Sequence, residues 1–131
     1  MSAADAVLAG RREAEALMVD ACTVTRPGDP VTDPDTGEVT PSSTPVYSGP
    51  CKVQQTISQA STPSAGGHQF TVQDSRVDFP VSAGPLMVDD VVTVTASVLD
   101  PQLAGSVFRV VELFHKSFAT AQRTRVSELV E

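Results

Sequence analysis

The chain has 131 residues, of which 40% are hydrophobic and 19% are charged, and its formal net charge is −7. These values predict one globular domain rather than a disordered chain. The negative charge argues against binding duplex DNA by neutralising its phosphates. The sequence contains no run of about 18 apolar residues, so no membrane span is predicted. No apolar segment follows a basic stretch at the N-terminus, so no signal peptide is expected and the cytoplasm of the producing cell is the expected compartment.

Residues 1–19 form the first predicted unit, with a helix over residues 2–18. Ser2 suits the N-cap, and Asp5 lies in the first turn, where a carboxylate interacts favourably with the helix dipole. A helix this short is marginal alone, so its apolar stripe should pack against the rest of the chain. The stripe comprises Val7, Gly10, Ala14, Leu17 and Met18.

From residue 20 the alternation changes to a period of two, which predicts that residues 20–131 form a β domain. Its first strand is expected over residues 21–26. Residues 27–50 then hold six of the ten prolines, four carboxylates and no basic residue, which predicts an extended arm or hairpin with a turn at residues 33–38. Residues 39–47 are expected to return as an irregular edge strand, because proline cannot serve a central strand.

Residues 57–68 are predicted to form a long flexible loop, because they are small, polar and without formal charge. Further strands are expected at residues 50–56, 69–80, 90–97, 106–114 and 123–130. Their alternation predicts a core of Cys22, Val24, Cys51, Val53, Phe70, Val72, Val92, Val94, Phe108 and Val110. The predicted fold class is mainly β: a small antiparallel β-barrel with an N-terminal α-helix and long flexible loops.

The sequence predicts no catalytic, cofactor or metal site. Cys22 and Cys51 lack a paired CxxC spacing, so two buried reduced thiols are expected, with a cross-strand disulfide only in an oxidising compartment. His68 and His115 are far apart and lack evident partners for a metal site or a triad. The turn at residues 33–38 resembles the start of a calcium loop, but its glycine falls one place early and the distal glutamate is missing.

One basic stretch remains, formed by His115, Lys116, Arg123 and Arg125 in a segment without acidic residues. Three formal charges and one nearby aromatic residue are few for a nucleic-acid surface. We interpret the stretch as a docking surface for an acidic neighbour, such as the next copy of the chain. A solvated strand end explains it equally well.

Several segments together resemble one family. The predicted helix leads into Asp-Ala-Cys-Thr-Val-Thr-Arg, then Asp-Pro-Asp-Thr-Gly-Glu-Val, Val-Tyr-Ser-Gly-Pro-Cys-Lys-Val-Gln and the flexible loop. The later segments are Arg-Val-Asp-Phe-Pro-Val, Asp-Asp-Val-Val-Thr-Val, Val-Phe-Arg-Val-Val-Glu and Ala-Gln-Arg-Thr-Arg-Val. Over nearly the whole chain, this pattern resembles the head-closure, or stopper, proteins of the head–tail connector of long-tailed phages that infect actinobacteria.

The resemblance implies a non-enzymatic virion protein, assembled in the host cytoplasm, with no cofactor and no membrane contact. It implies a homo-oligomeric ring, six- or twelve-fold, between an adaptor or portal-side ring and the tail terminator or tail-tube protein. Packaged double-stranded DNA would pass through without sequence-specific contacts. The channel loop would include Ile57, Ser58, Ser61, Ser64, Gly66, Gly67 and His68, and the interface would include Asp33, Asp35, Lys116, Arg123 and Arg125.

Two alternative functions stay open. A tail terminator, or another ring protein of the neck or tail end, would share the mainly β fold, whereas an adaptor should be mostly helical. A small ligand- or oligonucleotide-binding barrel should show aromatic stacking residues and a basic groove. Only 5% of the residues are aromatic, which disfavours this second alternative.

Overall fold

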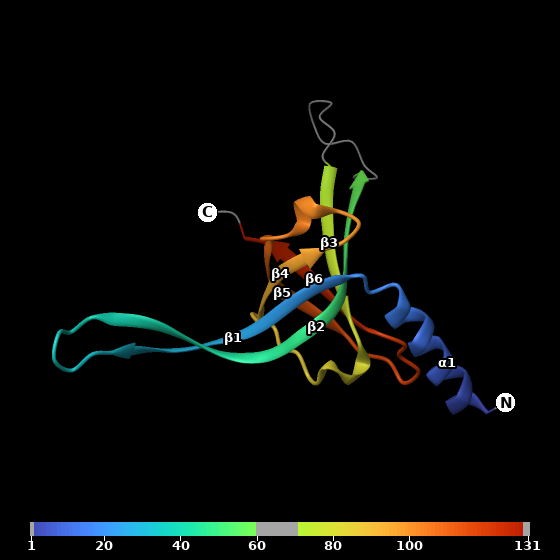
Figure 1. Ribbon diagram of the computed structural model, residues 1–131, viewed down its shortest axis with the longest axis horizontal. Helices are drawn as coiled ribbons and strands as arrows, with labels where there is room; N and C mark the ends of the chain where they lie inside the picture. Colours follow the sequence, from blue (N-terminus) through green and yellow to red (C-terminus); the bar gives the residue numbers. More distant parts are fainter. Residues whose placement is uncertain (1, 60–70, 130–131) are drawn as a thin grey trace, which may run out of the picture.

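A computed structural model describes the backbone of residues 2–59 and 71–129 (Figure 1). Two short 3-10 helices, η1 (Val81–Ala83) and η2 (Pro101–Leu103), lie in connections between strands. The predicted mainly β class with one N-terminal helix is confirmed. The main elements are α1 (Ala3–Ala16), β1 (Asp20–Thr32), β2 (Val39–Gln59), β3 (Thr71–Phe79), β4 (Val91–Ser97), β5 (Val107–Phe114) and β6 (Gln122–Glu128).

The six strands form one antiparallel sheet that closes on itself in the order β1-β2-β3-β6-β5-β4. Each strand therefore pairs on both sides within the closed part, which removes the free edges of an open sheet. β1 pairs with β4 from Asp20 to Thr25, and β2 pairs with β3 from Lys52 onward. We call this part of the sheet, together with residues 45–51 of β2 that pair with β1 there, the closed sheet.

Residues 27–44, from the segment 27–50, leave the closed sheet as a two-stranded β-ribbon, which we call the arm (Figure 1). The sequence predicted an irregular arm, with the first strand ending at residue 26 and a break near residue 48. Instead, β1 continues to Thr32 and β2 runs unbroken from Val39 to Gln59. The prolines are tolerated because the arm strands lie at an edge and their pairing shifts register at two points.

A second ribbon extends from the opposite end of β2, where β2 pairs with β3 as far as Gln59 and Thr71. Because β3 pairs with β6 only from Ser75 to Phe79, the outer part of this ribbon stands clear of the closed sheet (Figure 1). The predicted loop over 57–68 begins too early, since residues 57–59 continue β2. The remainder of that predicted loop lies outside the described residues.

The core lies inside the closed sheet, where alternate side chains of each strand meet. Seven predicted core residues are buried, and Val53 is partly buried against them. Phe70 and Val72 lie outside the described side chains. In β3 the buried apolar residues are Val77 and Phe79. The confirmed residues are Cys22, Val24, Cys51, Val92, Val94, Phe108 and Val110.

Both cysteines are buried and free, as the sequence predicted. A hydrogen bond with Cys51, together with burial, raises the pKa of the Cys22 thiol far above its ordinary value. A thiol in this state is a small core residue rather than a nucleophile. The two sulfur atoms therefore serve packing between β1 and β2.

Helix α1 begins with the predicted cap and packs against the segment before β6. Asp5 N donates to Ser2 Oγ at 3.1 Å, and Ser2 N donates to Asp5 Oδ2 at 3.2 Å, which forms a capping box. A Cβ on Gly10 would lie 2.8 Å from Thr120 Cγ2, so glycine permits this close approach. Leu17, which the sequence assigned to the packed stripe, is 59% exposed because the helix ends at Ala16 and Leu17 is its C-cap.

Candidate functional site

The outer face of β5 and β6 carries a cluster of cationic and aromatic side chains. In β6, Thr124 and Val126 point into the core, so Arg123 and Arg125 alternate to the outside. In β5, the register shifts between Val110 and Glu112, which marks a β-bulge at Val111. The bulge reverses the alternation, so Leu113 packs on the core and Phe114 emerges on the outer face opposite Arg123.

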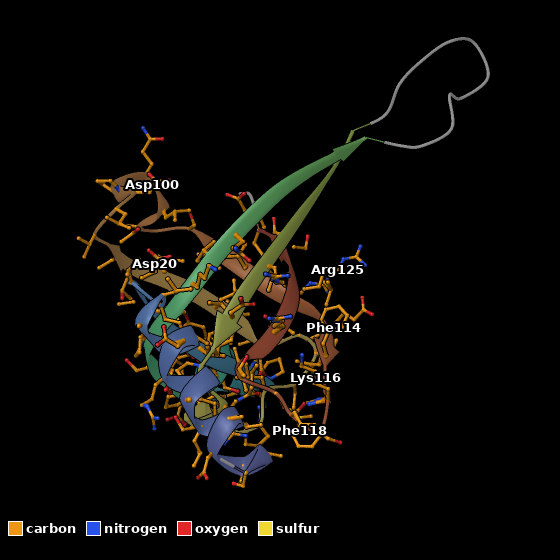
Figure 2. All side chains as sticks on the ribbon, turned by 90° about the vertical axis from the view of Figure 1, so that its right-hand side faces the viewer. Asp20, Asp100, Phe114, Lys116, Phe118 and Arg125 are labelled. Atoms are coloured by element: carbon orange, nitrogen blue, oxygen red, sulfur yellow. The ribbon has the colours of Figure 1, made fainter. Side chains whose placement is uncertain are left out.

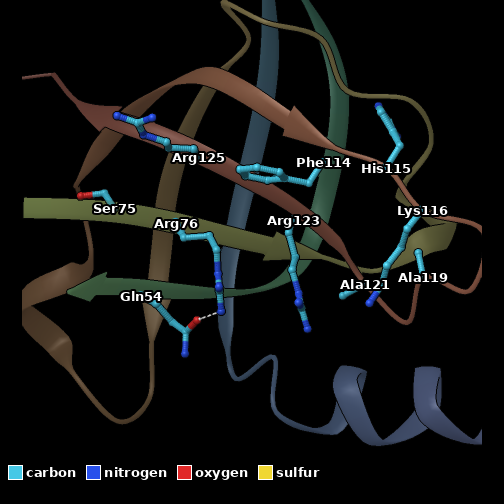
Figure 3. Close-up of a pocket in the computed structure, with 10 residues that line it drawn as sticks. All are labelled: Gln54, Ser75, Arg76, Phe114, His115, Lys116, Ala119, Ala121, Arg123 and Arg125. Atoms are coloured by element: carbon cyan, nitrogen blue, oxygen red, sulfur yellow. Dashed lines mark hydrogen bonds between the residues drawn. The ribbon is translucent and has the colours of Figure 1, made fainter. Parts of the chain in front are cut away.

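These strands border a pocket of about 410 Å³ (Figure 3). Four of the nine Lys and Arg residues of the chain line it, whereas no Asp or Glu is among the described residues that line it. In a protein with net charge −7, this concentration of positive charge is local rather than general. The basic pocket is lined by Gln54, Ser75, Arg76, Phe114, His115, Lys116, Ala119, Ala121, Arg123 and Arg125.

Part of the positive charge in the basic pocket is compensated. Arg125 Nη1 lies 3.3 Å from Glu112 Oε2, and both side chains are about half exposed. Arg76 donates to Gln54 Oε1 on the neighbouring strand (Figure 3). By contrast, Lys116 forms no ion pair with any residue that the structure describes. Arg123 likewise has no described carboxylate oxygen within 4.0 Å of its guanidinium nitrogens.

Asp78 lies buried beside the pocket, on the outward face of β3. Its Oδ1 is 3.2 Å from Arg76 Nε, but the two groups are not aligned as a hydrogen bond, and neither atom has a hydrogen-bond partner among the described residues. Burial raises the pKa of the Asp78 carboxyl, while the charges of Arg76, Arg123 and Lys52 act in the opposite direction. The carboxylate therefore lowers the net charge beneath the pocket without emerging at its surface.

The arm carries the opposite charge. All residues from 27 to 41 are exposed, and the segment 27–50 contains four carboxylates and no basic residue. At the turn, Asp35 N donates to Asp33 Oδ1 at 2.8 Å, and Gly37 takes the positive φ of 72° that closes the turn. The hydrogen bond from Asp35 lowers the pKa of the Asp33 carboxyl, so this group is held in its charged form.

An ion pair between the half-buried Arg26 and the buried Asp90 joins the base of the arm to the closed sheet. Arg26 donates from Nε to Asp90 Oδ1 at 2.9 Å and from Nη2 to Asp90 Oδ2 at 3.1 Å. Met87 N donates to the same carboxylate at 2.8 Å. Asp89, the neighbouring residue, faces outward and pairs with Arg109, so the adjacent carboxylates do not share a site.

The structure brings the predicted basic residues together and places the acidic ones elsewhere. Lys116, Arg123 and Arg125 line one pocket with His115, whereas Asp33 and Asp35 lie in the turn of the arm. Figure 2 shows Phe114, Lys116 and Arg125 along one side of the molecule. Of the predicted channel-loop residues, Ile57 and Ser58 belong to the backbone of β2. The others lie outside the described residues: Ser61, Ser64, Gly66, Gly67 and His68.

Sequence reasoning missed six of the ten lining residues, among them Gln54, Arg76 and Phe114. Gln54 and Arg76 are paired across β2 and β3, which only the strand register could reveal. The pairing of β3 with β6 likewise sets Arg76 opposite Arg125, and the alternation of β6 alone does not show this pairing. No feature of the sequence predicts the β-bulge that exposes Phe114.

The chain matches the family described as "Family of unknown function (DUF6093)" over residues 10–127 and therefore belongs to it. No curated protein matches the chain. Over the described residues, no helix is long and apolar enough to cross a membrane.

Proposed function

We propose that the protein is a structural subunit of the head–tail connector of a tailed phage. Copies would form a ring that closes the filled head, retains its DNA and provides the surface on which the tail docks. The arm is the observation that carries this proposal, together with the resemblance in sequence. A two-stranded ribbon is marginally stable alone in water, so a partner that packs against residues 27–44 would explain why the arm is ordered.

The closed sheet supports an assembly role for the arm. Because its strands pair on both sides, it offers no long free edge for adding a strand from another chain. Contacts between copies are then expected at the two ribbons that extend from it, namely the arm and the second ribbon (Figure 1). A subunit of this shape is suited to joining neighbours through side-chain contacts.

The charge distribution is compatible with a channel for DNA. A net charge of −7 disfavours adhesion of the polyanion, so DNA would slide past an assembled ring instead of binding to it. Residues 57–59, the first of the segment 57–68, lie in the outer part of the second ribbon, away from the closed sheet. This supports assigning that segment to the channel side of the ring.

The test is to locate the protein in particles and to remove it from them. In the phage whose genome encodes this chain, a tagged copy should be labelled at the neck in electron micrographs. Without the protein, filled heads should lose DNA and remain separate from tails. Heads that keep their genomes beside tails of altered length would instead indicate a tail terminator, and absence of the chain from the virion would contradict both functions.

A further inference from the structure

The arm and the basic pocket of one chain lie on opposite sides of the molecule. In Figure 1 the arm projects to the left, whereas the segment 115–121, which borders the pocket, lies to the right beside α1. The contact of this segment with the helix is direct, since Arg11 Nε donates to Ala119 O at 3.1 Å. The arm therefore points away from its own pocket, and a contact between the two requires a second copy.

The charge of the two surfaces is complementary. The arm offers Asp29, Asp33, Asp35 and Glu38, and none of these forms an ion pair with a described residue. The basic pocket offers arginine, lysine and histidine side chains, with no carboxylate among its described lining residues. Opposite charges steer two such surfaces together and set their register.

The prolines of the arm favour side-chain docking over the addition of a strand. A proline has no N–H to donate, so an edge that contains several of them is a poor template for β-augmentation. The same prolines restrict the arm before it binds, which lowers the entropy lost on binding. The acidic turn is the part of the arm that remains suited to entering a pocket.

We propose that the acidic turn of the arm in one copy binds in the basic pocket of the next copy. The contact deepens the proposed function by naming what joins neighbouring subunits, and its place in a phage ring rests on that function. Because arm and pocket are different surfaces, the contact is heterologous, and repetition of it generates a closed ring or a helical filament.

Apolar side chains border both surfaces and add to the contact. Val31 and Val39 flank the acidic turn and are 60% and 59% exposed. On the other side, Phe114 and Phe118 are 49% and 63% exposed, and Phe114 lines the pocket itself. A pocket of about 410 Å³ accommodates a few side chains of a turn, which fits this occupant better than a DNA duplex.

Charge exchange between the two surfaces provides the first test. The arm variant carries Asp29→Lys, Asp35→Lys and Glu38→Lys, and it keeps the hydrogen bond of Asp33 that forms the turn. A control variant with Glu13→Lys and Glu15→Lys on α1 changes the charge in the same direction but leaves the arm intact. Sedimentation velocity and native mass spectrometry report the association of each.

The complementary pocket variant carries His115→Glu, Lys116→Glu and Arg123→Glu. Each variant alone should associate at least about tenfold more weakly than the wild type, because like charges then face each other. An equimolar mixture should restore assembly with the two variants alternating, since both kinds of contact are then between opposite charges. If the triple pocket variant fails to fold, the double change at residues 115 and 116 replaces it. A mixture that associates no better than either variant overturns the proposal.

Cross-linking covers the case in which the purified wild type is monomeric. A chain with Asp35→Cys is mixed with a chain carrying Ala119→Cys, and disulfide formation is followed under mild oxidation. The native cysteines are buried and do not interfere. The pair should form about tenfold faster than Asp35→Cys with Val98→Cys, because docking raises the effective concentration of the two thiols. Equal rates would exclude the arm–pocket contact.

Three outcomes distinguish this proposal from DNA binding by the pocket and from the proposed phage function. If the pocket variant loses binding to a short DNA duplex while the arm variants associate normally, the pocket binds nucleic acid and the proposal is wrong. If charge exchange restores assembly but the protein is absent from phage necks, the contact stands and the phage function fails. If the protein is found in necks but cross-linking stays at the control rate, the phage function stands and the arm–pocket contact fails.

Discussion

β1 and β2 run through both the closed sheet and the arm, and the same two strands behave differently in each. Inside the closed sheet, β1 pairs with both β2 and β4, and Cys22 and Val24 are fully buried. In the arm, β1 pairs with β2 alone, and every residue from 27 to 41 is exposed. Most of the free energy of folding therefore comes from the closed sheet. The residues of the arm are not constrained by burial, so they can be charged residues and prolines.

The largest expected difference between the two regions is seen with apolar truncation. Phe108 is fully buried in the closed sheet, so Phe108→Ala should lower the free energy of unfolding by about 3–5 kcal/mol. Val39 in the arm is 59% exposed, so Val39→Ala should change it by no more than about 0.5 kcal/mol. Denaturant unfolding of the two variants measures both. A loss at Val39 similar to that at Phe108 would show that the arm is part of the cooperative core.

The closed sheet could be predicted from the sequence because alternation reports directly which face of a strand is buried. Cys22, Val24, Val92 and Val94 followed this rule and proved to be buried. In β3 the predicted core did not include the buried Val77 and Phe79, whereas the predicted Phe70 and Val72 lie outside the described side chains.

The arm was predicted as a segment but not as a ribbon. Proline and aspartate indicate turns, so the sequence did not predict that the pairing of β1 with β2 continues from Thr25 to Thr32. Strand pairing outside a core leaves no hydrophobic alternation to detect, so local composition dominated the interpretation. The acidic turn itself was located correctly at residues 33–38, because its residue types have specific turn preferences.

The basic pocket was only half visible in the sequence. Lys116, Arg123 and Arg125 are close along the chain, and their grouping needed little more than the strand order. Arg76 comes from β3, some 40 or more positions earlier, and joins them through the pairing of β3 with β6. Phe114 depends on a single extra residue in β5, and a bulge of this kind carries no reliable sequence signal.

A second, smaller effect is expected where the arm joins the closed sheet. Asp90 is fully buried and accepts hydrogen bonds from Arg26 and from Met87 N. Asp90→Ala leaves the Met87 N–H without its partner, which should lower the free energy of unfolding by about 1–3 kcal/mol.

The adjacent Asp89 is the matched control for this prediction. Its side chain is 65% exposed and pairs with Arg109 on the surface, so Asp89→Asn should cost no more than about 0.5 kcal/mol. Asparagine is the control residue rather than alanine because Asp89 has a positive φ of 76°, which asparagine tolerates. Equal losses at the two carboxylates would mean that burial does not distinguish them.

The smallest expected effect concerns Asp78, beneath the pocket, and it depends on pH. Burial raises the pKa of the Asp78 carboxyl above its ordinary value of 3.8, although three nearby cations oppose the shift. A raised pKa means that the folded protein holds the proton to higher pH than the unfolded chain does. The protonated carboxyl therefore contributes stability that is fully present below the ordinary pKa and is lost as the pH rises through the folded value.

Asp78→Asn replaces the carboxyl by a neutral group of the same shape at every pH. The free energy of unfolding of the variant should therefore gain on that of the wild type as the pH rises from about 3 to about 7. Urea unfolding across this range measures the difference. A wild type that instead gains on the variant would show that Arg76, Arg123 and Lys52 outweigh burial and hold Asp78 as a carboxylate. In that case the closed sheet would use buried charge beneath the pocket in the same way that it does at the base of the arm.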